Sequence, residues 1–299
     1  MNIIKQVSSL MCVSEDDIHI LKDNIGGMTN HSYLISIKGV KYVVREPGVG
    51  SNNLVNRQHE ASVIKSIMQH KSFNTPDMYE DNNFIKVSQY IEDSHTANSL
   101  FISDITKSLQ AIHTLHLSGI KVDFEYNLKE NILMYEALMK HSQFSEYEEV
   151  KSNCIKLLDI VNNQLKPAYT FTHVDFNPDN TLITKDCTYL IDFEYSAMQD
   201  PDLDFAMWCI YCMYSDENID NFIDLCISEK VNIEHNVHLF KAKIYAYIGI
   251  AGLLWSNWCE YKKLQGQDLG EYAMYQFMAA KKYSVKALHT LKELGYDKN

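Results

Sequence analysis

Residues 173 to 180 read His173-Val-Asp175-Phe-Asn-Pro-Asp-Asn180, and the apolar segment that follows ends in Ile191-Asp192-Phe-Glu194. Two acids and an amide therefore flank one predicted hairpin of short strands. Phosphoryl transfer needs a base near the acceptor hydroxyl and oxygen ligands for Mg²⁺ beside the phosphates. Asp175 fits the first role, and Asn180 and Asp192 fit the second. An ordinary polar loop is the alternative, but the HxDxxxxN spacing before a strand that ends in Asp favours phosphoryl transfer.

The chain around this segment is mostly helical, with short strands predicted at residues 171–175, 181–184 and 188–193. Apolar residues recur with helical spacing at Ile102–Leu117 and Tyr147–Leu165, and helices are expected again from Asp204 to the end. His173 is expected to brace the loop through hydrogen bonds rather than to transfer protons. The segment thus lies on a loop supported by helices, where catalytic groups are often found.

The N-terminal part of the chain is richer in strands. Residues 31–36 and 41–44 carry β-branched and aromatic side chains on either side of a Lys38-Gly39 turn, which predicts a hairpin. A helix is predicted at Leu54–His70 and a further strand at Phe84–Ile91. Because the pattern becomes helical after Glu92, we expect a lobe boundary there, between residues 1–92 and residues 93–299.

Two features of the N-terminal part could contact a nucleotide. The loop Gly26-Gly27-Met28-Thr29-Asn30 combines glycines, which let backbone amides approach phosphates, with two short polar side chains. A glycine turn in any hairpin explains the loop equally well, since it is neither a GxGxxG nor a Walker motif. Arg45, on a predicted strand, and Glu60, on the following helix, could form the ion pair that aims a cation at the phosphates.

The composition limits the class of partner. Of the 299 residues, 39 are acidic and 27 are Lys or Arg, and the net charge of −12 argues against nucleic acid and favours a cationic substrate. The seven scattered cysteines and the lack of a secretory signal predict a cytoplasmic protein. The longest apolar run, Ile248 to Trp255, is much shorter than the roughly 20 residues that span a bilayer, so no membrane insertion is expected.

Several motifs together resemble the choline/ethanolamine kinase family, and the bacterial choline kinases most closely. They are the glycine loop, Val44-Arg45, Asn56-Arg57-Gln-His-Glu60, His173-x-Asp175, Ile191-Asp192-Phe-Glu194-Tyr195, Asp200-Pro-Asp-Leu-Asp204-Phe-Ala and Leu254-Trp255-Ser-Asn-Trp258-Cys-Glu-Tyr261. The resemblance implies an α+β, bilobal protein-kinase-like fold with a small antiparallel-sheet N-lobe and a larger, mainly helical C-lobe. The N-lobe, residues 1–92, would bind the nucleotide, and the C-lobe, residues 93–299, would carry the catalytic and acceptor-binding residues. ATP would lie between the lobes, with adenine against the connector at Gln89, Tyr90 and Ile91.

The resemblance also implies an aromatic acceptor pocket in the C-terminal lobe, formed by Glu194, Tyr195, Trp255, Trp258 and Tyr261, with Tyr272 as a further candidate. Aromatic faces suit a quaternary ammonium, which donates no N–H hydrogen bond. Core packing is the alternative for each ring, and it is as good an explanation for Trp258 and Tyr261.

One stretch departs from the family pattern. Family members often carry an acid about two turns into the helix that starts near Asp204, whereas residues 206–214 read Ala-Met-Trp-Cys-Ile-Tyr-Cys-Met-Tyr. Trp208 and the pair Cys209 and Cys212 are interpreted as helix packing. His113 and His116, which share a helix without a third metal ligand nearby, are interpreted as structural.

These observations predict a choline kinase that uses ATP and Mg²⁺ and forms no covalent enzyme intermediate. A kinase of the same fold that acts on ethanolamine, thiamine or an aminoglycoside is the nearest alternative. A non-catalytic pseudokinase that serves as an interaction module is more distant, because Asp175, Asn180 and Asp192 are all present. The oligomeric state and the nucleotide preference are left open.

Overall fold

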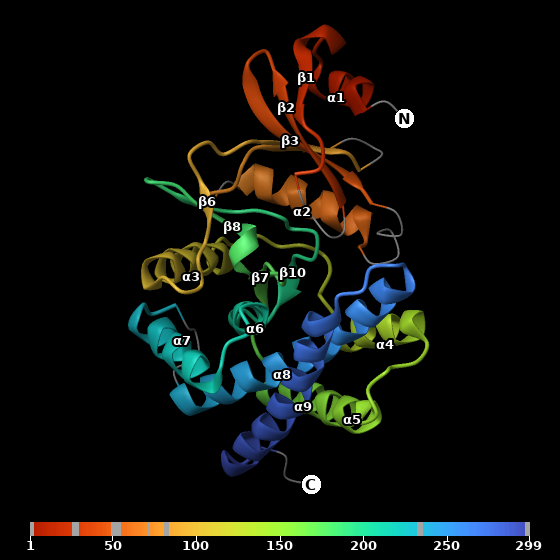
Figure 1. Ribbon diagram of the computed structural model, residues 1–299. Helices are drawn as coiled ribbons and strands as arrows, with labels where there is room; N and C mark the ends of the chain where they lie inside the picture. The colour runs from red at the N-terminus through yellow and green to blue at the C-terminus, as the bar shows by residue number, and fades with distance from the viewer. Residues whose placement is uncertain are drawn as a thin grey trace.

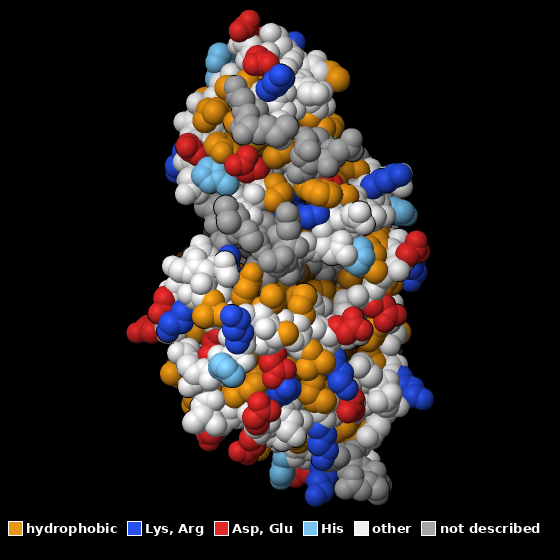
Figure 2. All heavy atoms as spheres, turned by 90° about the vertical axis from the view of Figure 1, so that its right-hand side faces the viewer, with side chains coloured by type: hydrophobic (Ala, Val, Ile, Leu, Met, Phe, Trp, Pro, Cys, Tyr) orange, Lys and Arg blue, Asp and Glu red, His pale blue; other side chains and the backbone are white. Residues whose placement is uncertain are grey.

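In this computed structural model the described residues are 3–25, 30–48, 55–70, 72–80, 84–231 and 236–296. A sheet with two helices forms one end of the molecule, and a larger assembly of helices forms the other (Figure 1). Acidic and basic side chains are interspersed over the face seen in Figure 2, without a continuous basic surface. The α+β, two-lobed arrangement expected from the sequence is confirmed.

The N-terminal lobe is built on a five-stranded antiparallel sheet with the strand order β1-β2-β3-β5-β4. Its strands are β1 (Ile18–Lys22), β2 (Asn30–Ile37), β3 (Val40–Pro47), β4 (Met78–Glu80) and β5 (Lys86–Gln89), and helices α1 (Ile3–Met11) and α2 (Arg57–His70) pack beside it. The predicted hairpin is β2 and β3, with Ile37 paired to Val40. Lys38 and Gly39 have φ angles of 51° and 84°, the left-handed conformation that tight hairpin turns need. Buried Ile35, Val44 and Val87 form the lobe's small core.

The C-terminal lobe is mainly helical. Its helices are α3 (Ile102–His116), α4 (Leu128–Met139), α5 (Tyr147–Ile160), α6 (Asp202–Tyr211), α7 (Asp216–Ser228), α8 (Val237–Leu264) and α9 (Gly270–Glu293), and a π-helical turn, Val161–Leu165, continues α5. Short strands form two small sheets, β7 (Thr170–Thr172) with β10 (Ala197–Gln199), and β6 (His95–Thr96) with β8 (Thr181–Ile183) and β9 (Thr188–Leu190). These sheets carry the loop that contains Asp175.

Two of the predicted strands end earlier than the sequence suggests. The strand expected at residues 171–175 stops at Thr172, and the one expected at residues 188–193 stops at Leu190. Val174 and Asp192 have φ angles of 71° and 66°, which a β-strand does not allow. Such a conformation costs roughly 1–3 kcal/mol and persists only where surrounding contacts impose it. The chain therefore turns out of each strand before the polar residues that the sequence singles out.

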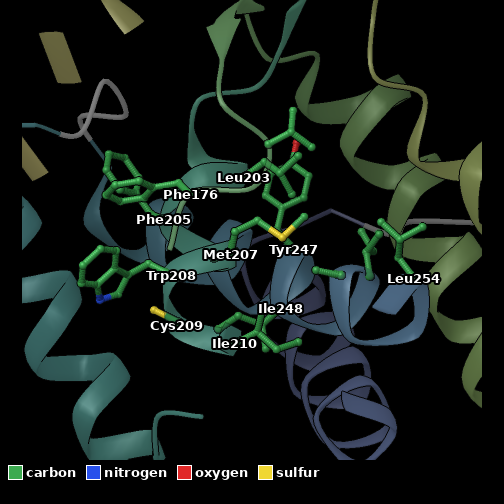
Figure 3. Close-up of a cluster of buried hydrophobic side chains, with 14 of the residues drawn as sticks. Phe176, Leu203, Phe205, Met207, Trp208, Cys209, Ile210, Tyr247, Ile248 and Leu254 are labelled. Atoms are coloured by element: carbon green, nitrogen blue, oxygen red, sulfur yellow. The ribbon is translucent and has the colours of Figure 1, made fainter. Parts of the chain in front are cut away.

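The core of the C-terminal lobe centres on α6 and α8. In Figure 3, Met207 and Ile210 of α6 lie beside Tyr247 and Ile248 of α8, whereas Phe205 and Trp208 point to the other side of α6. Trp208 is fully buried and its ring lies 4.9 Å from that of Phe176. Cys209 is 1% exposed, and burial raises the pKa of its thiol well above the usual value. The interpretation of Trp208 and Cys209 as packing residues is confirmed.

Helix α8 is long and apolar enough to cross a bilayer, but 78% of its most apolar window is buried within the protein. That degree of burial is typical of a central core helix. Its Gly249 and Gly252 let α9 approach closely: a Cβ atom on Gly252 would lie 2.6 Å from the carbonyl oxygen of Gln276 and 2.8 Å from the backbone nitrogen of Ala280.

Gly252→Val is therefore expected to force α8 and α9 apart. Overpacking a core costs about 1–3 kcal/mol, and here the clash involves backbone atoms that cannot change rotamer. We expect the free energy of unfolding in urea to fall by about 3 kcal/mol. Unchanged stability would show that the helices do not approach as closely as described.

Candidate active site

One cavity of about 790 Å³ lies between the lobes and collects most of the predicted site residues. They are Asn30, Arg45, Glu60, Gln89, Tyr90, Ile91, Asp175, Asn180, Asp192, Glu194, Tyr195, Trp255 and Trp258. Gly26, Gly27, Met28 and Thr29 lie outside the described residues. His173 is fully buried behind the cavity wall rather than in it. The cavity has a polar middle and an aromatic end in the C-terminal lobe.

The loop that carries Asp175 is anchored by a buried carboxylate. Asp204, in the first turn of α6, accepts hydrogen bonds from the backbone N–H of His173 at 2.9 Å and of Val174 at 2.7 Å. The Nε2 of His116 donates to the same carboxylate at 2.8 Å, and Asp204 is 0% exposed. These bonds hold Val174 in its left-handed conformation and so fix the direction in which the next residue, Asp175, projects. His116 has the structural role that the sequence suggested.

Two amides surround the carboxylate of Asp175. Asn177 begins the 3₁₀ turn η4 (Pro178–Asn180) by accepting from the backbone N–H of Asn180, and its Nδ2 donates to Asp175 at 3.2 Å. The Nδ2 of Asn180 donates to the other carboxylate oxygen of Asp175 at 2.8 Å. Burial raises the pKa of Asp175 well above its usual value, the charges of Asp192 and Glu194 raise it further, and the two amides oppose this. Asp175 is thus a more basic carboxylate than a free one.

Asn180 and Asp192 are brought together by the backbone. The N–H of Ile191 donates to the carbonyl oxygen of Asn180 at 3.0 Å, and the Nε2 of His173 donates to the carbonyl oxygen of Ile191 at 2.9 Å. His173 therefore braces the segment before Asp192, as predicted. The Nδ2 of Asn180 donates to Asp175, so the Oδ1 of the same Asn180 side chain points away from that carboxylate.

Cations from the N-terminal lobe meet the carboxylates of the C-terminal lobe. The guanidinium of Arg45, on β3, lies 2.6 Å from Asp192 and 2.9 Å from Glu194. Burial alone would raise the pKa of Asp192, but Arg45 and Lys86 hold it below its usual value. Burial and the neighbouring Asp192 raise the pKa of Glu194. The oxygens of Glu60, Asp192 and Glu194 lie within 4.8 Å of one another, so this part of the cavity gathers three carboxylates, which Arg45, Arg57 and Lys86 partner.

The predicted pairing of Arg45 with Glu60 was wrong. Glu60 is 1% exposed and pairs with Arg57 at 2.7 Å and with Lys86. Lys86 on β5 is the registered neighbour of Arg45 on β3, so both cations enter the cavity, and the guanidinium of Arg45 reaches across to the other lobe. Burial and Arg45 lower the pKa of Lys86. A carboxylate on α2 does anchor a strand cation, but that cation is Lys86.

Aromatic side chains form the far end of the cavity. The ring of Trp255 meets Tyr195 edge to face at 5.8 Å and Trp258 at 6.0 Å, and its Nε1 donates to the Sδ of Met207 at 3.3 Å. Tyr272 lines the same end. The rings of Trp255 and Tyr195 are thereby fixed at an angle to one another, which leaves π faces for a cation.

Tyr261 does not line the cavity. It is 5% exposed and packs in the core of the C-terminal lobe. Six residues after Trp255, it lies roughly a third of a turn away around α8 at 3.6 residues per turn. The prediction that Tyr261 contacts the substrate is therefore corrected, whereas Trp255 and Trp258, three residues apart, share the cavity face.

Some functional positions were missed by sequence reasoning. Lys86 and Asp204 each interrupt an apolar run, as in Phe84-Ile-Lys86-Val and Leu203-Asp204-Phe. A charge at a position that must be buried is a signal for a partnered functional group. Arg57 and Asp204 both stand in the family motifs quoted above, without a predicted role of their own. Arg57 is 6% exposed and hydrogen-bonded to Asn30 at 2.9 Å.

Comparisons with known proteins agree with this geometry. The family model described as choline/ethanolamine kinase matches residues 21–284. Protein LicA of Haemophilus influenzae is 25% identical over 279 residues, which cover 86% of this chain and 78% of LicA. The crystal structure of choline kinase LicA from Streptococcus pneumoniae superimposes with a TM-score of 0.78 at 28% identity, over 95% of this chain and 98% of that one. A structure of LicA in complex with AMP matches with a TM-score of 0.79 at 27% identity, over 95% and 97% of the two chains. These matches confirm the expected kinase-like fold.

Proposed function

The chain belongs to the choline/ethanolamine kinase family, and on this premise we propose that it transfers the γ-phosphoryl group of ATP to the hydroxyl of choline. It is an ATP-dependent small-molecule phosphotransferase. The observation that carries the choice of acceptor is the aromatic corner of Tyr195 and Trp255, which shares one cavity with Asp175. A bound choline would place its quaternary ammonium against the rings and its hydroxyl toward the carboxylate.

Asp175 is the group that orients the acceptor hydroxyl and accepts its proton. Its raised pKa makes it a better proton acceptor than an ordinary carboxylate, and the amides of Asn177 and Asn180 keep its oxygens in place. Direct, in-line transfer then requires no covalent enzyme intermediate. Most of the rate enhancement would come from positioning and electrostatics.

The oxygen donors of Asn180 and Asp192 suit Mg²⁺, which prefers carboxylate and amide oxygens, and the carboxylates of Glu60 and Glu194 lie close to Asp192. Bound there, Mg²⁺ would neutralise charge on the phosphates. Arg45, Lys86 and the loop from Gly26 to Asn30 would hold the phosphates themselves. Arg45 would then give up part of its ion pair with Asp192 and bind the phosphates of the nucleotide instead.

The adenine is proposed to lie against Gln89, Tyr90 and Ile91, which line the cavity where the chain leaves β5. The next strand, β6, already pairs with β8 in the C-terminal lobe. This supports lobes at residues 1–92 and 93–299, with the connector between them. A cytoplasmic location remains a prediction.

Trp255→Ala is expected to raise the KM for choline about 30-fold and to leave the KM for ATP nearly unchanged. A desolvated cation over an indole face is worth about 2 kcal/mol, and each 1.4 kcal/mol is tenfold. Steady-state kinetics with each substrate varied in turn measures both constants.

Two further substitutions separate cation binding from packing. Trp255→Phe keeps a π face and should recover part of the affinity, whereas Trp255→Leu fills space and should not. Equal choline binding by the two variants would contradict a cation–π role for Trp255.

A further inference from the structure

A tyrosine and a carboxylate that the mechanism above does not use also line the cavity. Asp179 belongs to the 3₁₀ turn η4, between Asp175 and the end of the loop, and Tyr211 is the last residue of α6. The hydroxyl of Tyr211 donates a hydrogen bond to the Oδ2 of Asp179. The two side chains come from elements far apart in the sequence, and their contact holds the carboxylate at the acceptor end of the cavity.

The neighbours of Tyr211 place this pair beside the acceptor site. Burial raises the pKa of its phenol above the usual value, and Asp179, Tyr272 and Asp175 add to the rise. Burial also raises the pKa of the Tyr272 phenol, and Cys259 and the same Asp175 carboxylate add to the rise. Tyr211 therefore remains protonated and donates to Asp179, within electrostatic reach of the group that receives the acceptor hydroxyl.

Asp179, like Asp175, differs from the other three carboxylates of the cavity in having no cationic partner in the part of the chain that the structure describes; Asp175 is held by the amides of Asn177 and Asn180. Asp192 and Glu194 are paired with Arg45, and Glu60 with Arg57 and Lys86. Among the described residues, no lysine or arginine forms an ion pair with Asp179, and a neutral phenol leaves its negative charge uncompensated. Asp179 is exposed to solvent, and its carboxylate lines the cavity together with Trp255 and Tyr272, without a cationic partner among the described residues.

We propose that Asp179, positioned by Tyr211, attracts the ammonium group of the acceptor and makes the site selective for cationic alcohols. This inference rests on the proposed function. A quaternary ammonium gains Coulomb attraction from the carboxylate in addition to its contact with the aromatic faces. A neutral alcohol of the same shape gains only the apolar contact, so the charge sets selectivity rather than the rate of transfer.

The test compares choline with 3,3-dimethylbutan-1-ol, in which a carbon atom replaces the charged nitrogen. Asp179→Asn should raise the KM for choline about fivefold, which at 1.4 kcal/mol per tenfold is about 1 kcal/mol, the upper range for a solvent-accessible ion pair. The KM for the neutral alcohol should stay within about twofold, and so should kcat for choline. Tyr211→Phe keeps the ring but releases the carboxylate, and should lower the preference for choline by a smaller factor.

Two control variants separate the loss of the Asp179 charge from a change in net charge elsewhere or in the shape of the side chain. Asp186→Asn removes the same charge from an exposed position outside the cavity and should leave the preference unchanged. Asp179→Glu keeps the charge and should retain most of the preference. If Asp179→Asn prefers choline over the neutral alcohol as strongly as the wild type does, the inference is overturned while choline kinase activity stands. If the wild-type enzyme phosphorylates neither alcohol, the proposed function fails and the inference with it.

Discussion

Asp175→Asn is expected to lower kcat for choline by about 10²- to 10⁴-fold, the usual contribution of a positioned general base. Asparagine preserves the shape of the side chain but cannot accept the proton of the acceptor hydroxyl. Affinity for the nucleotide, measured by calorimetry, should change by less than about threefold, because Asp175 faces the acceptor. Turnover within about threefold of wild type would remove Asp175 from the mechanism.

The same variant should fold about as stably as the wild type. The pKa of Asp175 is raised in the folded protein, so its ionised form is disfavoured there relative to the unfolded chain. The stability that protonation confers is present at low pH and is lost as the pH rises through the raised pKa. At neutral pH a neutral amide removes that penalty, which offsets the hydrogen bond lost where the new Nδ2 group meets the Nδ2 of Asn177 or Asn180. A Tm close to that of the wild type together with lost activity would exclude unfolding as the cause. Asp186→Asn, which changes the net charge equally, should retain full activity.

Asp204→Asn should have the largest effect on stability. The two carboxylate oxygens of Asp204 accept from the backbone N–H groups of His173 and Val174 and from the His116 ring. Asparagine replaces one of these oxygens with an NH2 group, which cannot accept, so at least one donor loses its partner. Breaking a fully buried charged network typically costs about 3–5 kcal/mol. We expect the urea midpoint to fall accordingly.

The kcat of Asp204→Asn should also fall, even under conditions in which the variant is folded. The backbone at Val174 loses the contacts that impose its left-handed conformation, so the carboxylate of Asp175 shifts, and a displacement of about 1 Å can cost roughly 10²-fold in rate. An Asp204→Asn variant with wild-type stability and kcat would contradict the role of Asp204 as the anchor of this loop.

Local patterns predicted much of the architecture. The hairpin around Lys38-Gly39 and the helices at residues 102–116 and 147–160 follow from short-range spacing of apolar residues, and the structure contains them close to the expected bounds. The catalytic loop was also apparent, because its polar residues are close in sequence. Its strands were predicted too long, since the left-handed turns at Val174 and Asp192 are imposed by partners elsewhere in the chain.

Pairings between distant residues could not be derived in the same way. Three cations and three carboxylates from both lobes compete for one another, and only their arrangement in space assigns Glu60 to Arg57 and Lys86 rather than to Arg45. The inclusion of Tyr261 with the cavity tryptophans failed for a related reason. Closeness in sequence on α8 does not specify which side of the helix faces the cavity.

The central claim is that this protein phosphorylates choline. Its most direct test is ³¹P NMR of the purified protein with ATP, Mg²⁺ and choline, which follows the nucleotide and any phosphorylated product in one sample. The account predicts a phosphocholine resonance that grows in step with ADP, and its absence when Asp175→Asn replaces the wild type. ATP that stays intact, or ADP that forms without phosphocholine, would contradict it.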